Sequence, residues 1–163
     1  MVIGILCAPA AQAVELTAAV GLTEHKGSTW RIGLSQGWGA RWLQSGRGYV
    51  GGYWEGAYTQ WCSKNGKLGA RTVSFSPVLL YRFERVSWQP FIEAGIGVSL
   101  FSKTQVCCRR LGSAFNFEDR LGVGLVLSGG AQLGLRAIHY SNARIKMPNE
   151  GINSFSLFYR HPL

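Results

Sequence analysis

Apolar and polar side chains alternate along several long segments of the chain. In residues 91–101, one set of alternate positions is entirely aliphatic, and the intervening set includes a glutamate, a serine and two glycines. A period of two predicts a β-strand with two unlike faces. The same pattern recurs in residues 30–35, 72–83 and 115–127. The chain is therefore predicted to form long, two-faced strands.

The second face of these strands is rich in glycine and carries charges of both signs. Its charged residues are Glu93, Glu118, Arg31, Arg82, Arg120 and Arg136. In a soluble β-sandwich this face would be wet and would rarely contain so much glycine. A small barrel, in contrast, needs small residues and paired polar groups inside. The apolar face then points outward, an arrangement that suits lipid.

Eight strands can be counted along the chain. They span roughly 14–23, 29–38, 47–61, 70–83, 88–102, 111–127, 132–143 and 152–161. Bacterial outer-membrane barrels have an even number of strands, which returns both chain ends to the periplasmic side. Eight strands leave an interior that side chains fill, so a pore is not expected. We predict an all-β protein, a single eight-stranded antiparallel transmembrane barrel over residues 14–163.

Length and composition agree with this fold. The 163 residues favour one domain, and they include 22 glycines, 12% aromatic and 15% charged residues. No apolar run approaches the roughly 18 residues that a membrane helix needs. A membrane-spanning helix is therefore excluded, whereas a membrane barrel is not.

The N-terminal segment resembles a secretory signal. Residues 2–9 are largely apolar, and Ala-Gln-Ala at 11–13 has the small-x-small pattern of a cleavage site. We predict that residues 1–13 are a signal peptide and that the mature chain begins at Val14. The usual basic segment is missing, so we expect the true translation start to lie upstream of Met1. The alternative interpretation is a buried first strand.

Three cysteines follow this segment, an odd number for a compartment that permits disulfides. Cys62 can pair with either Cys107 or Cys108, and we favour one such disulfide between loops over three free thiols. The adjacent pair lacks both a CxxC spacing and a nearby histidine. A zinc site is therefore not expected.

The predicted topology places four loops outside the cell, at 24–28, 62–69, 103–110 and 144–151. These loops and their margins form a basic rim of nine among the 17 basic residues: Lys26, Lys64, Lys67, Arg71, Lys103, Arg109, Arg110, Arg144 and Lys146. Such a rim favours anionic lipid headgroups, although charges kept for solubility explain it equally well. Nucleic acid is a poor partner for a barrel that faces outward, despite the net charge of +9.

Two polar residues interrupt the apolar face of the seventh strand. Leu133, Leu135, Ala137, His139 and Ser141 share this face, so His139 and Ser141 point into the membrane boundary. Alternate residues lie about 6.5–7 Å apart along a strand, within reach of an imidazole and a hydroxyl. Polar groups at a lipid surface are costly unless they act on something there.

Asn153 shares the outward face of the eighth strand with Phe155, Leu157 and Tyr159. The seventh and eighth strands are hairpin neighbours, so Asn153 is expected beside His139. Serine, histidine and an amide can serve as nucleophile, base and orienting group. An isolated HxS pair is a weak signal, and its position on the apolar face near the outer rim strengthens it.

Longer motifs resemble a known family. RAIHYSNA at 136–143, PNEGI at 148–152, SLFYR at 156–160, FIEAGIGV at 91–98, NFEDRLGVGL at 116–125 and GYWEGAYTQW at 52–61 are similar to the lipid A 3-O-deacylase (PagL) family of outer-membrane enzymes. The resemblance covers most of the mature chain. It implies an eight-stranded barrel that hydrolyses the ester-linked acyl chain at the 3 position of lipid A. It implies neither a cofactor nor a metal.

By this resemblance Ser141 is the nucleophile and His139 the general base. The family's third residue is an acid, and the matching position here is Asn153. An amide oxygen can accept the proton of the second ring nitrogen, as in papain-like proteases, but it cannot stabilise an imidazolium by charge. In a serine protease the Asp-to-Asn change costs about 10⁴ in rate, chiefly through the wrong tautomer. Outer-membrane phospholipase A, a different barrel, nevertheless resembles this histidine, serine and asparagine arrangement.

Three further residues near the outer loop are candidates. Glu150 is the alternative orienting acid, although it can instead balance Arg144 and Lys146, and we favour Asn153 over it. Asn142 and Asn149 match family asparagines near the nucleophile, and their amide donors suit an oxyanion. By alternation Asn142 lies on the opposite strand face, so this role requires a twist or bulge after Ser141. The alternative for both asparagines is turn chemistry.

The main hypothesis is an esterase in the bacterial outer membrane that acts on the lipid A part of lipopolysaccharide in the outer leaflet. A phospholipase or acyltransferase is the second hypothesis, and a non-catalytic barrel for adhesion or membrane integrity is the third. Lipid A and the surrounding membrane lipids are the expected partners. The oligomeric state stays open, with a homodimer as one option.

Overall fold

The structure is a computed structural model that describes residues 13–62, 65, 67–84 and 88–163. The predicted signal peptide, apart from Ala13, lies outside the described residues, and so does Lys64 of the basic rim.

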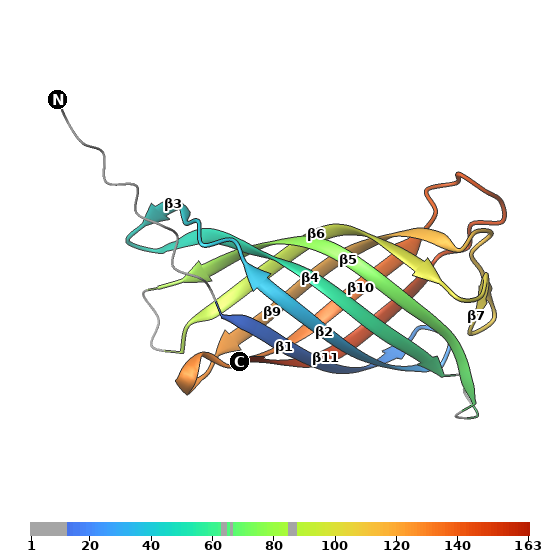
Figure 1. The fold of residues 1–163 in the computed structure, drawn as a ribbon, viewed down its shortest axis with the longest axis horizontal. Coiled ribbons are helices and arrows are strands. Elements are labelled where there is room, and N and C mark those ends of the chain that lie inside the picture. Colours follow the sequence, from blue (N-terminus) through green and yellow to red (C-terminus); the bar gives the residue numbers. More distant parts are fainter. Residues whose placement is uncertain (1–12, 63–64, 66, 85–87) are drawn as a thin grey trace.

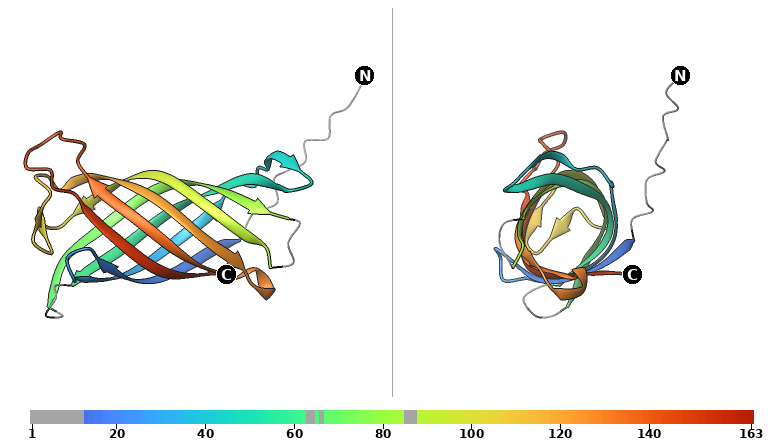
Figure 2. Two further views of the ribbon diagram at one scale, coloured as in Figure 1. Left: turned by 180° about the vertical axis from the view of Figure 1, so that it is seen from behind. Right: turned by 90° about the vertical axis from the view of Figure 1, so that its left-hand side faces the viewer.

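Eight antiparallel strands close into a barrel (Figures 1 and 2). They are β1 (Val14–Thr23), β2 (Ser28–Gly37), β4 (Gly48–Cys62), β5 (Leu68–Phe83), β6 (Pro90–Phe101), β9 (Phe115–Val126), β10 (Gln132–Ser141) and β11 (Ile152–Pro162). Strands adjacent in this order pair with one another, and β1 pairs with β11 to close the ring. The predicted eight-stranded antiparallel barrel is confirmed, with strand limits within two residues of those expected except at the start of β9.

Short elements extend the barrel at both ends. At one end lie β3 (Trp42–Ser45) and the 3-10 turn η1 (Ser128–Gly130), and at the other the hairpin of β7 (Gln105–Val106) and β8 (Arg109–Arg110). β9 begins at Phe115 rather than at 111 because the preceding loop turns inward and buries Val106 and Leu111. The sequence prediction placed the strand start too early because apolar residues that close a barrel mouth cannot be distinguished in sequence from those of a strand.

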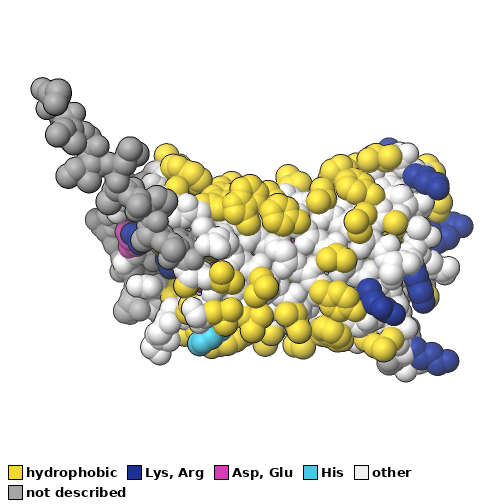
Figure 3. All heavy atoms as spheres, viewed as in Figure 1, with side chains coloured by type: hydrophobic (Ala, Val, Ile, Leu, Met, Phe, Trp, Pro, Cys, Tyr) yellow, Lys and Arg dark blue, Asp and Glu magenta, His cyan; other side chains and the backbone are white. Residues whose placement is uncertain are grey.

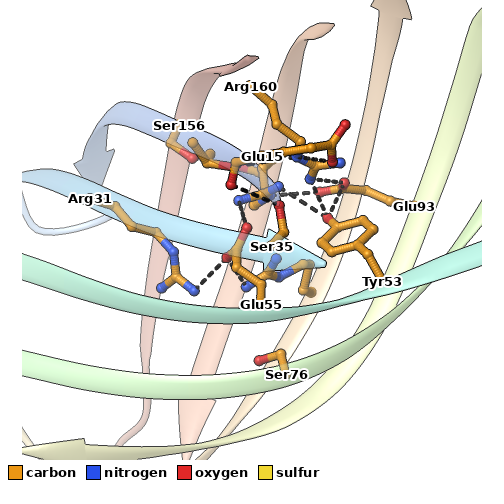
Figure 4. Close-up of polar contacts among 12 residues, drawn as sticks. Glu15, Arg31, Ser35, Tyr53, Glu55, Ser76, Glu93, Ser156 and Arg160 are labelled. Atoms are coloured by element: carbon orange, nitrogen blue, oxygen red, sulfur yellow. Dashed lines mark hydrogen bonds and ion pairs between the residues drawn. The ribbon is translucent and has the colours of Figure 1, made fainter. Parts of the chain in front are cut away.

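Charged side chains fill the barrel interior, as the alternation predicted. Arg120 Nη2 lies 2.6 Å from Glu118 Oε1 and 2.8 Å from Glu55 Oε1, and Arg136 Nε lies 2.6 Å from Glu93 Oε1. Figure 4 shows the part of this network around Glu55 and Glu93. Each carboxylate therefore faces at least one guanidinium, which offsets the cost of removing both charges from water.

The outside of the barrel carries an apolar belt (Figure 3). Its residues that are at least 60% exposed include Val20, Leu22, Val73, Ile96, Leu121 and Leu135. A soluble protein rarely presents so continuous an apolar surface, whereas a membrane barrel requires one. The outward faces of the strands are those that the alternation predicted.

An aromatic cluster closes the end of the barrel that carries β7 and β8. The ring of Tyr140 packs edge-on against Trp61 and Phe101, with centroids 5.4 Å and 5.3 Å apart. Val106, Leu111 and Ile152 also belong to this buried cluster. The interior is therefore filled, and Tyr140 and Ile152 anchor β10 and β11 from within, next to the outward-facing His139 and Asn153.

The preferred disulfide is not formed, because Cys62, Cys107 and Cys108 are all free thiols. The two loops nevertheless meet here: the Cys107 thiol donates a hydrogen bond to the backbone oxygen of Cys62 over 3.6 Å. Burial raises the pKa of the Cys107 thiol, so it stays a protonated donor. A hydrogen bond therefore joins the two loops where a disulfide was expected.

Candidate active site

His139 and Asn153 lie side by side on the outside of the barrel. They are direct partners in the register of β10 and β11, and His139 Nδ1 is 2.7 Å from Asn153 Oδ1. This is a normal hydrogen-bond length. Because the amide oxygen can only accept, Nδ1 carries the proton in this arrangement and Nε2 is left as the basic nitrogen.

Ser141 lies two residues after His139 on the same strand and is half-buried. It faces Phe117 of β9 in the register. Among the described residues no hydrogen bond joins Ser141 to His139, although alternation puts both side chains on the same face. Catalytic contacts of this kind often tighten only when substrate is bound.

Gly151 brings the last outer loop against the imidazole. Its φ is +61°, and a Cβ built there would lie 2.8 Å from His139 Cε1. Both the backbone conformation and the close approach therefore require glycine. Arg109 of β8 holds this stretch, because its Nε donates to the Gly151 carbonyl at 2.9 Å and its Nη2 donates to the Glu150 carbonyl.

Glu150 makes its contacts away from the imidazole. Its Oε2 accepts a hydrogen bond from the Arg110 backbone N–H at 2.6 Å, and its Oε1 is 3.5 Å from Arg110 Nε. The backbone N–H of Arg110 lowers the pKa of the Glu150 carboxyl. Of the two candidate orienting groups, the structure therefore brings only Asn153 to His139, and Glu150 pairs with Arg110 rather than with Arg144 or Lys146.

The two candidate oxyanion residues differ in whether their side-chain N–H donors are already used. Asn142 is fully buried, and its Nδ2 donates to the carbonyls of Leu111 at 2.7 Å and Lys146 at 2.6 Å. No bulge turns it outward: β10 ends at Ser141, and positive φ angles at residues 143 and 144 form a tight turn that leaves Asn142 inside. Its backbone N–H donates to Asn149 Oδ1 at 3.0 Å. Asn142 therefore folds the loop and orients the amide of Asn149.

Two acids near His139 were missed by the sequence reasoning. Asp119 of β9 is the direct partner of His139 on the other side of β10, and it is exposed. Glu24, just after β1, accepts a hydrogen bond from Asn153 Nδ2 at 2.7 Å. The signals were available: Asp119 interrupts the apolar set of its strand, and closure of the barrel brings the end of β1 beside the start of β11.

An apolar groove leads away from this site along the outer surface. It has a volume of about 810 Å³, and His139, Asn153, Ala137, Leu121, Ile96 and Ala94 are among its lining residues. Lys and Arg side chains gather at the same end of the barrel as β7 (Figures 1 and 3). A closed barrel with an apolar belt, and with a histidine–amide pair beside a serine at the rim of that belt, has the form of an outer-membrane enzyme that works at the lipid surface.

The relatives of the chain give the family. A family model described as lipid A 3-O-deacylase (PagL) matches residues 26–162. The lipid A deacylase PagL of Pseudomonas aeruginosa is 50% identical over 153 residues, which cover 94% of this chain and 88% of that protein. The Bordetella bronchiseptica lipid A deacylase PagL is 46% identical over 71 residues, covering 44% of this chain and 40% of that protein.

A solved structure agrees. The crystal structure of the outer membrane enzyme PagL superposes with a TM-score of 0.86 and 50% identity, covering 91% of this chain and 99% of that one. The chain belongs to the lipid A 3-O-deacylase (PagL) family. Three predictions are thereby confirmed: the family, the activity class of a carboxylic ester hydrolase, and the location in the bacterial outer membrane.

Proposed function

We propose that this chain removes the 3-O-linked acyl chain of lipid A by a serine–histidine mechanism. Ser141 is the nucleophile, His139 the general base and Asn153 the group that orients the imidazole. The observation that carries the proposal is the 2.7 Å contact between His139 Nδ1 and Asn153 Oδ1 on the outward face of the strand that also bears Ser141.

His139 transfers a proton in each step of the reaction. Because Nδ1–H donates to Asn153, Nε2 can take the proton of the Ser141 hydroxyl as its Oγ attacks the ester carbonyl carbon. The imidazolium then returns this proton to the departing 3-oxygen of the sugar, which leaves as a hydroxyl. Water, activated by the same nitrogen, hydrolyses the acyl-serine and releases a fatty acid.

The developing oxyanion needs a positioned donor. Asn149 fits this part better than Asn142, because its Oδ1 is held by the Asn142 backbone N–H while its Nδ2 has no acceptor among the described residues. Both donors of the Asn142 amide group are already used within the loop. Asn142 therefore contributes by fixing the orientation of the Asn149 amide.

Lipid A fits the surroundings of the site. The groove beside His139 is apolar and open to the lipid side, as an acyl chain requires. Of the basic rim, Lys26, Lys103, Arg144 and Lys146 are exposed in the loops at the end of the barrel that carries β7 and β8. Positive side chains at this level attract the phosphates of a lipid headgroup.

The test is mass spectrometry of lipid A after incubation with the refolded protein in detergent. We expect the wild-type protein and Ser128→Ala, an exposed serine of η1 at the opposite end, to remove one 3-hydroxyacyl chain. Ser141→Ala should remove none, and dephosphorylated lipid A should react more slowly. Fatty acid release from phospholipids alone would indicate a phospholipase, and intact lipids with every folded form would indicate a non-catalytic barrel.

A further inference from the structure

A carboxylate lies directly behind the amide that contacts the imidazole. His139 Nδ1 is 2.7 Å from Asn153 Oδ1, and Asn153 Nδ2 donates to Glu24 Oε2 at 2.7 Å. The three side chains form one continuous hydrogen-bonded row from three segments of the chain. We propose that Glu24 is a positioning residue that acts on His139 through the amide of Asn153, and this role rests on the proposed function.

An asparagine by itself is an ambiguous partner for a histidine. If its oxygen faces Nδ1, the imidazole holds the Nδ1–H tautomer and Nε2 is free to accept the serine proton. If its amino group faces Nδ1, the proton moves to Nε2 and the ring can no longer act as a base towards Ser141. The second arrangement is the one that costs a serine protease about 10⁴ when its aspartate becomes asparagine.

Glu24 removes this ambiguity. An ionised carboxylate accepts hydrogen bonds and donates none, so only the amino group of Asn153 can face it. The amide oxygen must then face His139, and the imidazole must carry its proton on Nδ1. The carboxylate also places a negative charge at the far end of the row. The charge-assisted hydrogen bond that it accepts from Asn153 Nδ2 polarises the amide, whose oxygen faces the imidazolium formed in the reaction.

The fold holds Glu24 in place for this contact. β1 and β11 pair with Thr23 opposite Ser154, so the residue after β1 emerges beside Asn153. A short turn follows, closed by the 2.8 Å hydrogen bond from Thr23 N to the Gly27 carbonyl. Glu24 Oε1 lies 3.6 Å from His25 Nε2 and 3.9 Å from Arg109 Nε, and its side chain is only 29% exposed.

A positioning role of Glu24 and a merely structural role predict different results in two backgrounds, the wild type and Asn153→Glu. In the wild type, Glu24→Ala should lower kcat roughly 10- to 100-fold, as the loss of the partner that orients a metal-bound histidine does, with KM changed less than about twofold. Glu24→Gln keeps an acceptor and should lose less. Glu84→Ala, the same exchange at an exposed site near Arg41 at the opposite end, should have no effect.

In an Asn153→Glu background the imidazole faces a carboxylate directly, and there is no amide to orient. Glu24→Ala should therefore cost at most about twofold there. An equal loss of kcat in both backgrounds would mean that Glu24 only supports the loop, and it would overturn the proposal.

A second readout does not depend on activity. Nitrogen-15 NMR of the imidazole of His139, assigned with His139→Ala, should show the Nδ1–H tautomer in the wild type and a mixture in Glu24→Ala. An unchanged tautomer in Glu24→Ala would overturn the role of Glu24 even if lipid A is hydrolysed. Absence of hydrolysis by the wild type would instead refute the proposed function, while the tautomer would still decide on Glu24.

Discussion

Polar groups occupy both surfaces of this barrel, but they are arranged differently inside and outside. In the interior, Arg31, Arg120, Arg136 and Arg160 share Glu55, Glu93 and Glu118 so that each carboxylate has several partners. On the lipid side, the row of Glu24, Asn153 and His139 ends at the imidazole Nε2, which has no hydrogen-bond partner among the described residues, and Ser141 follows two residues later on β10. An interior network of paired charges fills and fixes the barrel, whereas a row that ends in a free acceptor can act on a substrate.

The outer site is also supported by the interior. Tyr140 and Ile152 point into the barrel next to His139 and Asn153, and both are buried in the aromatic cluster. Arg31 Nη1 donates to the Tyr140 hydroxyl at 3.1 Å, which joins the ion-paired interior to the strand that bears His139. The outer site is thus built on strands that are fixed from within, as precise positioning of reactive groups requires.

The largest effect on the interior is expected from Glu93→Gln. It removes the charge that pairs with Arg136 and Arg160 and accepts from Tyr53 at 2.7 Å. Breaking a buried pair from one side costs about 3–5 kcal/mol, so the unfolding midpoint in detergent should fall while kcat per folded molecule is kept. Glu84→Gln, in an exposed pair with Arg41, should change stability by about 1 kcal/mol at most. Equal stability losses would contradict the division between the two surfaces.

A smaller effect, on activity rather than on stability, is expected from Gly151→Ala. The new Cβ would meet the His139 ring at 2.8 Å, so the imidazole should move and kcat should fall roughly tenfold or more, given that a shift of about 1 Å can cost 10²-fold. Gly129→Ala is the matched control, because its φ of +80° brings the same backbone strain while nothing lies within 4 Å. Lipid A hydrolysis and thermal unfolding should be measured for both. A similar activity loss in both variants would point to backbone strain rather than to the imidazole.

Alternation along the strands was enough to predict most of the fold. It predicted which residues face inward, and the interior positions of Glu93, Glu118, Arg31, Arg120 and Arg136 follow from it because the side-chain period of a strand is two. It also predicted the shared outward face of His139 and Asn153. β4 also contributes Glu55 and Tyr53 to the interior, but aromatic residues on both of its faces obscure the alternation there.

The loop contacts could not be predicted in the same way, since they depend on segments far apart in sequence. Leu111 fills the barrel mouth, and Asn142 donates to its carbonyl; neither contact has a periodic signal. The same holds for Glu150, which pairs with Arg110 of the β7–β8 hairpin. Glu24 is the exception, because closure of the predicted barrel already places the end of β1 beside the start of β11 and hence Glu24 beside Asn153.

The most direct measurement is covalent labelling of the protein in detergent with a fluorophosphonate, followed by peptide mass spectrometry. Such probes react with serines that a neighbouring base activates. We expect the label on Ser141, and we expect it to disappear in His139→Ala while Glu93→Gln, where folded, keeps it. Labelling of another serine, or no labelling of Ser141 in protein that hydrolyses lipid A, would contradict the assignment of the outward row as the reactive site.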